Sequence, residues 1–356
     1  MSGFKIERLK DLFDNFRGKQ VAVLGDLMLD RYVWGSVSRI SPEAPVPVLE
    51  IESESARLGG AANVANNIKS LGAEPILFGI VGNDASGDKL RQTLSEMGLS
   101  DEGVITDPQR PTTVKTRVIA HSQHVVRMDY EVRKEIDKTI VNRVIEILNS
   151  MSNEVDAVLL EDYNKGMLTK ELLSLVIGFA KKKNKVISVD PKQSNFFEFK
   201  HVTVFKPNKK EAEGALGLSA GSDEQAVTVA KELLNRLDCE NVLLTRGEKG
   251  MTLVEKDGTF AHFPTKARKV ADVSGAGDTV ISTLTVALVS GATIKEAAAI
   301  ANHAGGIVCG EVGIAPVEKT KLFNEVLNDS KSLSEWILDE SSMTRPVGSR
   351  RPSGEF

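Results

Sequence analysis

The sequence predicts an α/β protein built on a doubly wound, mostly parallel sheet with helices on both faces. Two observations carry this prediction. Apolar runs of strand length alternate along the chain with segments of helical periodicity, and the runs are continuous, as in parallel strands that are buried on both faces. The 356 residues, of which 41% are hydrophobic, are enough for one large domain of this class.

The predicted elements follow one another in regular order. The strands are expected at residues 21–25, 76–81, 155–160, 186–189, 202–205 and 242–245. The helices are expected at residues 60–71, 84–97, 138–150, 169–182 and 223–237, after an amphipathic helix within residues 1–20. No secretion signal precedes them, and the longest apolar stretch is shorter than the roughly 20 residues of a membrane span. We therefore expect a cytoplasmic protein.

Two segments interrupt this alternation, at residues 31–57 and 112–130. Each has the pattern of a β-hairpin that lies outside the main sheet, and together they predict a small accessory sheet. Such a sheet could cover an active site, pair with a partner chain, do both, or only decorate an edge.

The composition predicts how the chain divides into a domain and a tail, and the charge excludes some classes of partner. Residues 1–330 are predicted to form one domain, and residues 331–356, rich in Ser, Arg, Pro and Gly, a flexible tail with a short helix at 332–338. The net charge of −4 and the lack of a basic stripe argue against binding of nucleic acid or a membrane surface.

One glycine-rich turn carries the strongest chemical signal. It ends in Gly275, Ala276, Gly277 and Asp278, directly before a helical run. Small residues let backbone amides converge on an anion at a helix N-terminus, and the carboxylate of Asp278 stays ionised there. An anion hole beside a carboxylate base suits phosphoryl transfer. The alternative is an ordinary glycine turn with a capping aspartate.

Two other segments fit a ligand site. Gly59 and Gly60 open a second small-residue turn into a helix, in which Asn63 offers both a donor and an acceptor to hydroxyl groups. Asp30 follows the first strand, at the edge where open α/β sheets bind ligands. The alternatives are close helix packing for the glycines and a turn for Asp30.

The two glycine motifs together resemble the signatures of the PfkB, or ribokinase-like, family of carbohydrate kinases, and the resemblance extends from about residue 10 to about residue 325. It implies a three-layer ribokinase-like fold with a small β-sheet lid. It also implies that Asp278 is the catalytic base, that Gly275, Ala276 and Gly277 form the anion hole, and that the segment at Gly59, Gly60 and Asn63 contacts the sugar together with Asp30.

The resemblance also predicts a nucleotide side. Asn208 and Glu211 match a motif that orders Mg²⁺ and phosphate through water, although the same pair reads as a helix capping box. The remaining residues expected to contact ATP are Thr245, Arg246, Gly247, Gly250, Asn302 and His303. The implied cofactors are ATP and Mg²⁺, and a monovalent cation such as K⁺ is expected near Asp272.

Three segments narrow the choice of sugar. Residues 32–48, 161–166 and 189–192 resemble the corresponding segments of D-glycero-β-D-manno-heptose 7-phosphate kinases. Glu161 and Asn164 depart from that pattern, but Asn can adopt the left-handed conformation of the glycine it replaces. The cations expected to bind the 7-phosphate are Lys165, Lys192, Arg117 and Arg127.

The implied reaction transfers the γ-phosphate of ATP to the anomeric hydroxyl and gives heptose 1,7-bisphosphate, a precursor of ADP-heptose and the lipopolysaccharide core. A kinase for fructose 1-phosphate, ribose or another sugar, and a non-catalytic sugar-phosphate sensor, are the alternatives. We find no signature of the nucleotidyltransferase domain that accompanies related kinases, and expect a stand-alone kinase or a kinase fragment. A homodimer that forms through the lid is also expected.

Overall fold

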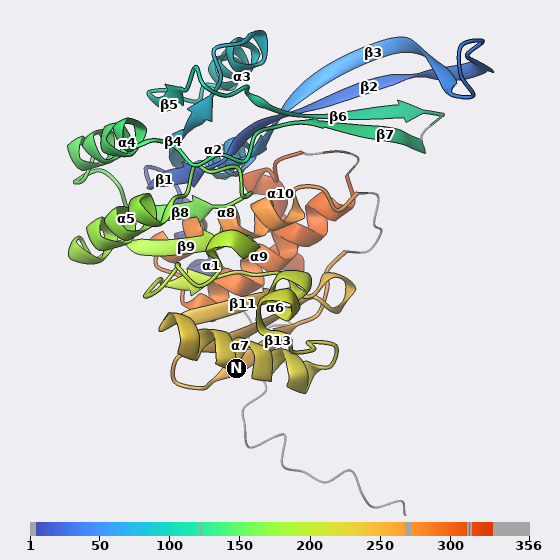
Figure 1. Cartoon of the computed structure of the whole chain (residues 1–356). Coiled ribbons are helices and arrows are strands. Elements are labelled where there is room, and N and C mark those ends of the chain that lie inside the picture. Colours follow the sequence, from blue (N-terminus) through green and yellow to red (C-terminus); the bar gives the residue numbers. More distant parts are fainter. Residues whose placement is uncertain (1–4, 122, 268–271, 312, 314, 330–356) are drawn as a thin grey trace, which may run out of the picture.

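The computed structural model describes residues 5–121, 123–267, 272–311, 313 and 315–329. Within these residues the chain forms a layered α/β body, from which a long, narrow second sheet extends (Figure 1). Residues 331–356, predicted to be a tail with a helix at 332–338, lie outside the described part. The division into a domain at residues 1–330 and a tail therefore stays a prediction.

The strands are β1 (Gln20–Gly25), β2 (Leu27–Ile40), β3 (Pro47–Gly60), β4 (Glu74–Val81), β5 (Gly103–Thr106), β6 (Thr113–Ala120), β7 (Gln123–Tyr130), β8 (Ala157–Glu161), β9 (Val186–Asp190), β10 (Val204–Phe205), β11 (Asn241–Thr245), β12 (Met251–Glu255) and β13 (Phe260–Phe263). The helices are α1 (Ile6–Asp14), α2 (Ala61–Ser70), α3 (Ala85–Glu96), α4 (Lys138–Ser150), α5 (Lys170–Lys182), α6 (Lys209–Leu216), α7 (Asp223–Leu237), α8 (Ala276–Val289), α9 (Ile294–Cys309) and α10 (Lys319–Asn328).

The central sheet has the order β13-β12-β11-β10-β9-β8-β1-β4-β5. All neighbouring strands pair parallel except at one edge, where β12 runs in the reverse direction and pairs antiparallel with both β11 and β13. In β1, Val21 and Val23 belong to the core that α1, α2, α3, α8, α9 and α10 share. Ala22 and Leu24 belong to the opposite core, which α4, α5, α6 and α7 cover. Both faces of the sheet are thus buried, and the predicted doubly wound fold is confirmed.

The second sheet, called the lid sheet here, has the order β3-β2-β6-β7. β2 pairs parallel with β6, and the other two pairings are antiparallel. Asp30 lies opposite Lys115 across β2 and β6, and Arg117 lies opposite Arg127 across β6 and β7. Because opposed residues point to the same side of a sheet, these four side chains share one face. The predicted accessory sheet is confirmed, with strands that reach further into the body than expected.

Most predicted helices match the structure closely, and α4 and α7 have the predicted bounds. α2 begins at Ala61, directly after Gly60, whose φ of 58° places it in the left-handed region. The hairpin of β12 and β13 was not predicted. None of the described helices has the length and apolar character required to cross a bilayer.

Candidate active site

Asp278 lies in the first turn of α8, which begins after Gly275 with its φ of 78°. The side chain is buried, and both of its oxygens accept hydrogen bonds. Asn63 Nδ2 donates to Oδ2 over 2.7 Å, and the hydroxyl of Tyr163 donates to Oδ1 over 3.0 Å. Three segments far apart in the chain therefore meet at one carboxylate, and two of them, at Asn63 and Asp278, were predicted to belong to the site.

The surroundings of Asp278 adjust its basicity. Burial raises the pKa of this carboxyl to about 6, and the charge of Asp190 adds to the effect, whereas the hydrogen bonds from Asn63 and Tyr163 oppose it. A carboxylate with a pKa near the working pH is ionised often enough to act and basic enough to accept a proton. Asp278 therefore has the properties of a general base.

Two further acids lie beside Asp278. Carboxylate oxygens of Glu161, Asp190 and Asp278 come within 4.8 Å of one another, and all three side chains are buried. Neither oxygen of Glu161 has a hydrogen-bond partner within the described residues. Burial, first, and the charges of Asp190 and Asp278 raise the pKa of Glu161. Carboxylate oxygens are preferred ligands of divalent cations, so this group fits a metal such as Mg²⁺.

Lys206 supplies a positive charge next to these acids. Its ammonium lies 2.7 Å from Asp190 Oδ2, and the side chain is 3% exposed. A methyl group on Gly277 would lie 3.5 Å from the same ammonium, so Lys206 stands beside the first turn of α8. No role was predicted for Lys206, because nothing in Lys-Pro-Asn indicates that the lysine is buried. An anion bound at the backbone amides of the first turn of α8 would therefore also lie near the ammonium group of Lys206.

A loop after β8, residues 162–167, carries Tyr163 and Lys165 and is held by one buried carboxylate. Asp26 accepts the backbone N–H groups of Tyr163, Lys165 and Met167 over 2.8, 3.0 and 3.1 Å. Asn164 has a φ of 55°, which confirms the predicted left-handed conformation. The loop therefore has one fixed shape, and Tyr163 is directed at Asp278.

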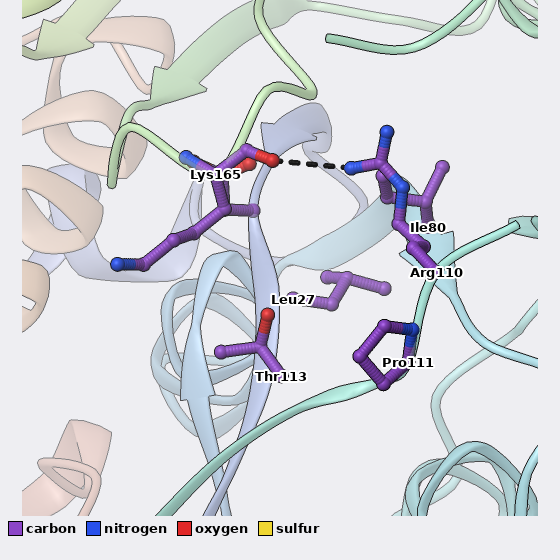
Figure 2. Close-up of a pocket in the computed structure, with 7 residues that line it drawn as sticks. Leu27, Ile80, Arg110, Pro111, Thr113 and Lys165 are labelled. Carbon is purple, nitrogen blue, oxygen red and sulfur yellow. Dashed lines mark hydrogen bonds between the residues drawn. The ribbon is translucent and has the colours of Figure 1, made fainter. Parts of the chain in front are cut away.

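Arg110 also holds this loop. Figure 2 shows it reaching the carbonyl of Lys165, at 3.1 Å, beside a cavity of about 10 Å³. Arg110 also donates to the carbonyl of Lys134 over 2.7 Å and pairs with Asp107 over 2.8 Å. A cavity of this size holds one water molecule at most, so this junction is packed and rigid.

The predicted phosphate-binding cations all have carboxylate partners in this structure. Lys165 pairs with Glu131 over 2.6 Å, and Arg127 pairs with Asp129 over 2.9 Å with 59% of its side chain exposed. The other two pairs are Lys192 with Glu211 and Arg117 with Asp30. A phosphate that binds at any of these cations must compete with, or join, a carboxylate.

Gly59 and Gly60 permit a close approach of chain segments. A Cβ on Gly59 would lie 2.2 Å from Asp30 Oδ2, and one on Gly60 would lie 2.3 Å from the carbonyl oxygen of Asp26. Both distances exclude a larger residue. The two glycines therefore bring Asp30 and the N-terminus of α2, with Asn63, next to one another, as a sugar site requires.

The predicted nucleotide side is ordered by backbone contacts. Asn208 and Glu211 form the predicted capping box of α6, with hydrogen bonds of 2.8 and 2.9 Å. The N–H of Thr245 donates to the carbonyl of Pro207 over 3.0 Å, which joins the two loops. Gly250 has a φ of 74° and no room for a side chain.

The other residues expected to contact ATP are engaged with the protein. Arg246 Nη1 lies 2.6 Å from Asp223, and that guanidinium is 1% exposed. On α9, Asn302 donates to the carbonyl of Pro264 over 2.8 Å, and His303 is buried. Gly247 begins the short 3₁₀ turn after Arg246. The assignments of these residues to ATP, and that of Asp272 to a monovalent cation, stay predictions.

The buried Asp278 and Lys206 beside the first turn of α8 are compatible with phosphoryl transfer. The model of the pfkB family of carbohydrate kinases matches residues 19–321, and the chain belongs to this family. It is accordingly a phosphotransferase that acts on a sugar hydroxyl, and binding of ATP follows from the family.

Relatives of higher sequence identity include bifunctional proteins. The chain is 44% identical over 311 residues to the bifunctional protein HldE of Paramagnetospirillum magneticum, and the aligned residues cover 87% of this chain and 64% of that protein. It is 41% identical over 316 residues to HldE of Geobacter sulfurreducens, covering 89% and 64%. The chain thus spans somewhat less than two thirds of the length of these relatives.

Solved structures support the fold. Ribokinase of Arabidopsis thaliana with ribose and ATP superposes with a TM-score of 0.70 at 18% identity, covering 87% of this chain and 99% of that one. Phosphofructokinase-2 of Escherichia coli with potassium gives 0.71 at 19% identity, covering 89% and 99%. The ribokinase-like fold predicted from the sequence is therefore confirmed.

Proposed function

We propose that this protein phosphorylates the anomeric hydroxyl of D-glycero-β-D-manno-heptose 7-phosphate to give heptose 1,7-bisphosphate, in the synthesis of ADP-heptose. The observation that carries the kinase chemistry is the buried Asp278 at the start of α8, held by Asn63 and Tyr163. The sugar is supported by the likeness of residues 32–48 and 161–166 to heptose 7-phosphate kinases and by the similarity to HldE proteins.

In this reaction Asp278 accepts the proton of the anomeric hydroxyl as that oxygen attacks the γ-phosphorus of ATP, and the bond between the γ-phosphorus and the departing ADP breaks. The amides at the start of α8, where Gly275, Ala276 and Gly277 lie, face the transferred phosphoryl group, because the first turn of a helix leaves its N–H groups without partners in the helix. Lys206 adds positive charge at the same place. The lid sheet excludes water, which limits hydrolysis of ATP.

A Mg²⁺ ion would be held near Asn208 and Glu211 through water, with Glu161 and Asp190 close by. When bound, such an ion would supply positive charge that offsets the charge developing on the transferred phosphoryl group. A K⁺ site near Asp272 and a cytoplasmic location belong to the same proposal.

The test of the proposed substrate is a screen of ADP release with heptose 7-phosphate, ribose, fructose 6-phosphate and fructose 1-phosphate. We expect heptose 7-phosphate to give the highest kcat/KM. Turnover of another sugar together with none of heptose 7-phosphate would refute the assignment. Binding of a sugar phosphate without any turnover would favour the alternative function, a non-catalytic sugar-phosphate sensor.

The pH dependence should reveal the base. Because Asp278 must be ionised to accept a proton and its pKa is raised to about 6, kcat/KM is expected to be constant above pH 7 and to fall about tenfold per unit below pH 6. A pH profile between 4.5 and 8, measured with saturating metal and ATP, checks this. An acid limb centred near pH 4, the usual range of an aspartate, would contradict it.

We also propose that two copies associate through the lid sheet. The face of β7 that lies opposite to Arg127 carries Val126, Met128 and Tyr130, with exposed fractions of 47, 53 and 66%. An edge strand with such a row of exposed apolar side chains is a place for another chain to pair or pack. A second copy offers the same row, so a symmetric contact buries both.

Met128→Glu is therefore expected to convert a dimer into a monomer at micromolar concentration, because two buried carboxylates would face one another across the symmetry axis. Light scattering coupled to gel filtration measures the mass. Leu175→Glu, on α5 with a side chain of similar exposure, is the control and should leave the mass unchanged. A monomeric wild-type protein would rule out this contact.

A further inference from the structure

Lys115 is a lid lysine without a direct ion pair. It lies in β6, opposite Asp30 of β2 and Asp129 of β7. Arg117 pairs with Asp30, and Arg127 pairs with Asp129. Lys115 itself forms no ion pair and no hydrogen bond with any residue that the structure describes, although Asp30 and Asp129 are near enough to favour its charge. Its ammonium group is therefore available to an anion on the face of the lid sheet that carries Asp30.

The position of Lys115 relates it to the catalytic base. Its ammonium lies 5.0 Å from the ring centroid of Tyr163, within the range of a cation–π contact. The hydroxyl of the same ring donates to Asp278. Lys115 and Asp278 therefore contact the same tyrosine side chain, the first over its ring and the second at its hydroxyl. Burial lowers the pKa of Lys115, the charge of Asp30 opposes this effect, and the charge of Lys165 lowers the pKa further. An anion bound here would relieve the repulsion between the two ammonium groups.

Lys165 is near Lys115, and its carboxylate partner has one oxygen without a hydrogen bond. It forms a largely buried ion pair of 2.6 Å with Glu131 Oε1. Arg133 reaches the same oxygen over 3.3 Å, whereas Glu131 Oε2 is buried without a hydrogen-bond partner. A buried carboxylate oxygen without a hydrogen bond is unfavourable. Glu131 is therefore a counter-ion that a better anion can displace.

We propose that Lys115 and Lys165 form the subsite that binds the phosphate group of the acceptor sugar, and that this phosphate displaces Glu131 from Lys165. The inference rests on the proposed function, since it places the acceptor's phosphate within the same site. The sugar ring then lies alongside Tyr163, with its reacting hydroxyl at Asp278 and its phosphate at the two lysines.

This arrangement also explains a preference for phosphorylated sugars. A phosphate carries up to two negative charges and three acceptor oxygens, enough to satisfy both ammonium groups at once. A sugar without a phosphate would leave Lys115 without an ion pair and Glu131 in place, so it gains nothing from this subsite. The difference in binding free energy between the phosphorylated and the unphosphorylated sugar is the source of specificity.

The decisive variant is Lys115→Met, which removes the charge and keeps the aliphatic stem. We expect the KM for heptose 7-phosphate to rise about 10- to 100-fold, the effect of one charged hydrogen bond, with kcat and the KM for ATP within threefold of wild type. Lys138→Met, an identical change at an exposed lysine of α4, should leave all three constants unchanged. Thermal unfolding of both variants verifies the fold.

A second measurement does not depend on turnover. Calorimetric titration with heptose 7-phosphate and with inorganic phosphate should show binding to the wild type and to Lys138→Met, and at least tenfold weaker binding to Lys115→Met. If the wild type turns over another sugar phosphate instead, while Lys115→Met still loses phosphate binding, the subsite stands and the proposed substrate fails. Equal affinities of wild type and Lys115→Met in both titrations would overturn the subsite.

Glu131→Gln tests the displacement. Removal of the competing charge should strengthen phosphate binding severalfold, because Lys165 is then free for the incoming anion. Unchanged or weaker binding in this variant would show that Glu131 does not compete with the sugar phosphate.

Discussion

Asp278→Asn is expected to lower kcat by about 10²- to 10⁴-fold while ATP still binds, because the amide cannot accept the proton of the sugar hydroxyl. The variant also loses one of the two hydrogen bonds at this position, since an amide nitrogen cannot accept from Asn63 or Tyr163. Single-turnover kinetics with saturating sugar phosphate, together with the Kd for ATP, measure the two effects separately.

Asp14→Asn is the matched control, an identical change at an exposed aspartate of α1 that should leave kcat unchanged. Asp278→Asn should also abolish the acid limb of the pH profile near pH 6. Turnover at the wild-type rate in this variant would remove Asp278 from the role of base. It would leave the fold and the family as they are.

Lys206→Met is expected to reduce both stability and activity. The ammonium is buried against Asp190, and its loss leaves buried carboxylates without a counter-ion, which destabilises a protein by about 3–5 kcal/mol. Urea denaturation at pH 7 measures this loss, and kcat should fall as well, because the charge beside Gly277 is gone.

The double variant Lys206→Met/Asp190→Asn separates the two effects. It removes both partners of the buried pair, so part of the stability should return, whereas kcat should remain low. Lys200→Met, at an exposed lysine, is the control for the substitution itself. A loss of less than 1 kcal/mol in Lys206→Met would mean that the buried pair contributes little to folding.

The general fold could be predicted because its signals are local and repeated. The periodicity of α4 and α7 fixes their bounds, and β1 reads as an apolar run because its residues point alternately into two cores. The hairpin of β12 and β13 escaped prediction because its two short strands flank a turn at Asp257 and Gly258 and do not alternate with helices. The parallel pairing of β2 with β6 was likewise not predictable, because it joins segments far apart in sequence and no local pattern specifies it.

The site was only partly predictable, for a similar reason. Glycine turns and a helix start indicate where an anion can bind, so Asp278 and Asn63 were found, although they are far apart in sequence. The partners of charged residues depend on tertiary contacts. Burial of Lys206, the approach of Tyr163 to Asp278 and the pairing of Lys165 with Glu131 therefore became visible only in the structure.

The parallel pairing of β2 with β6 has a consequence for how the protein folds. Asp30 and Arg117, which pair across it, are 87 residues apart, and β3, α2, β4, α3 and β5 lie between them. Joining such distant segments carries a large loop-closure entropy and is slow compared with local contacts. The lid sheet should therefore complete after the body has condensed. A partly folded chain would then hold Asp278 and Asn63 together before the lid sheet shields them from water. Binding of a sugar would favour this last step of folding.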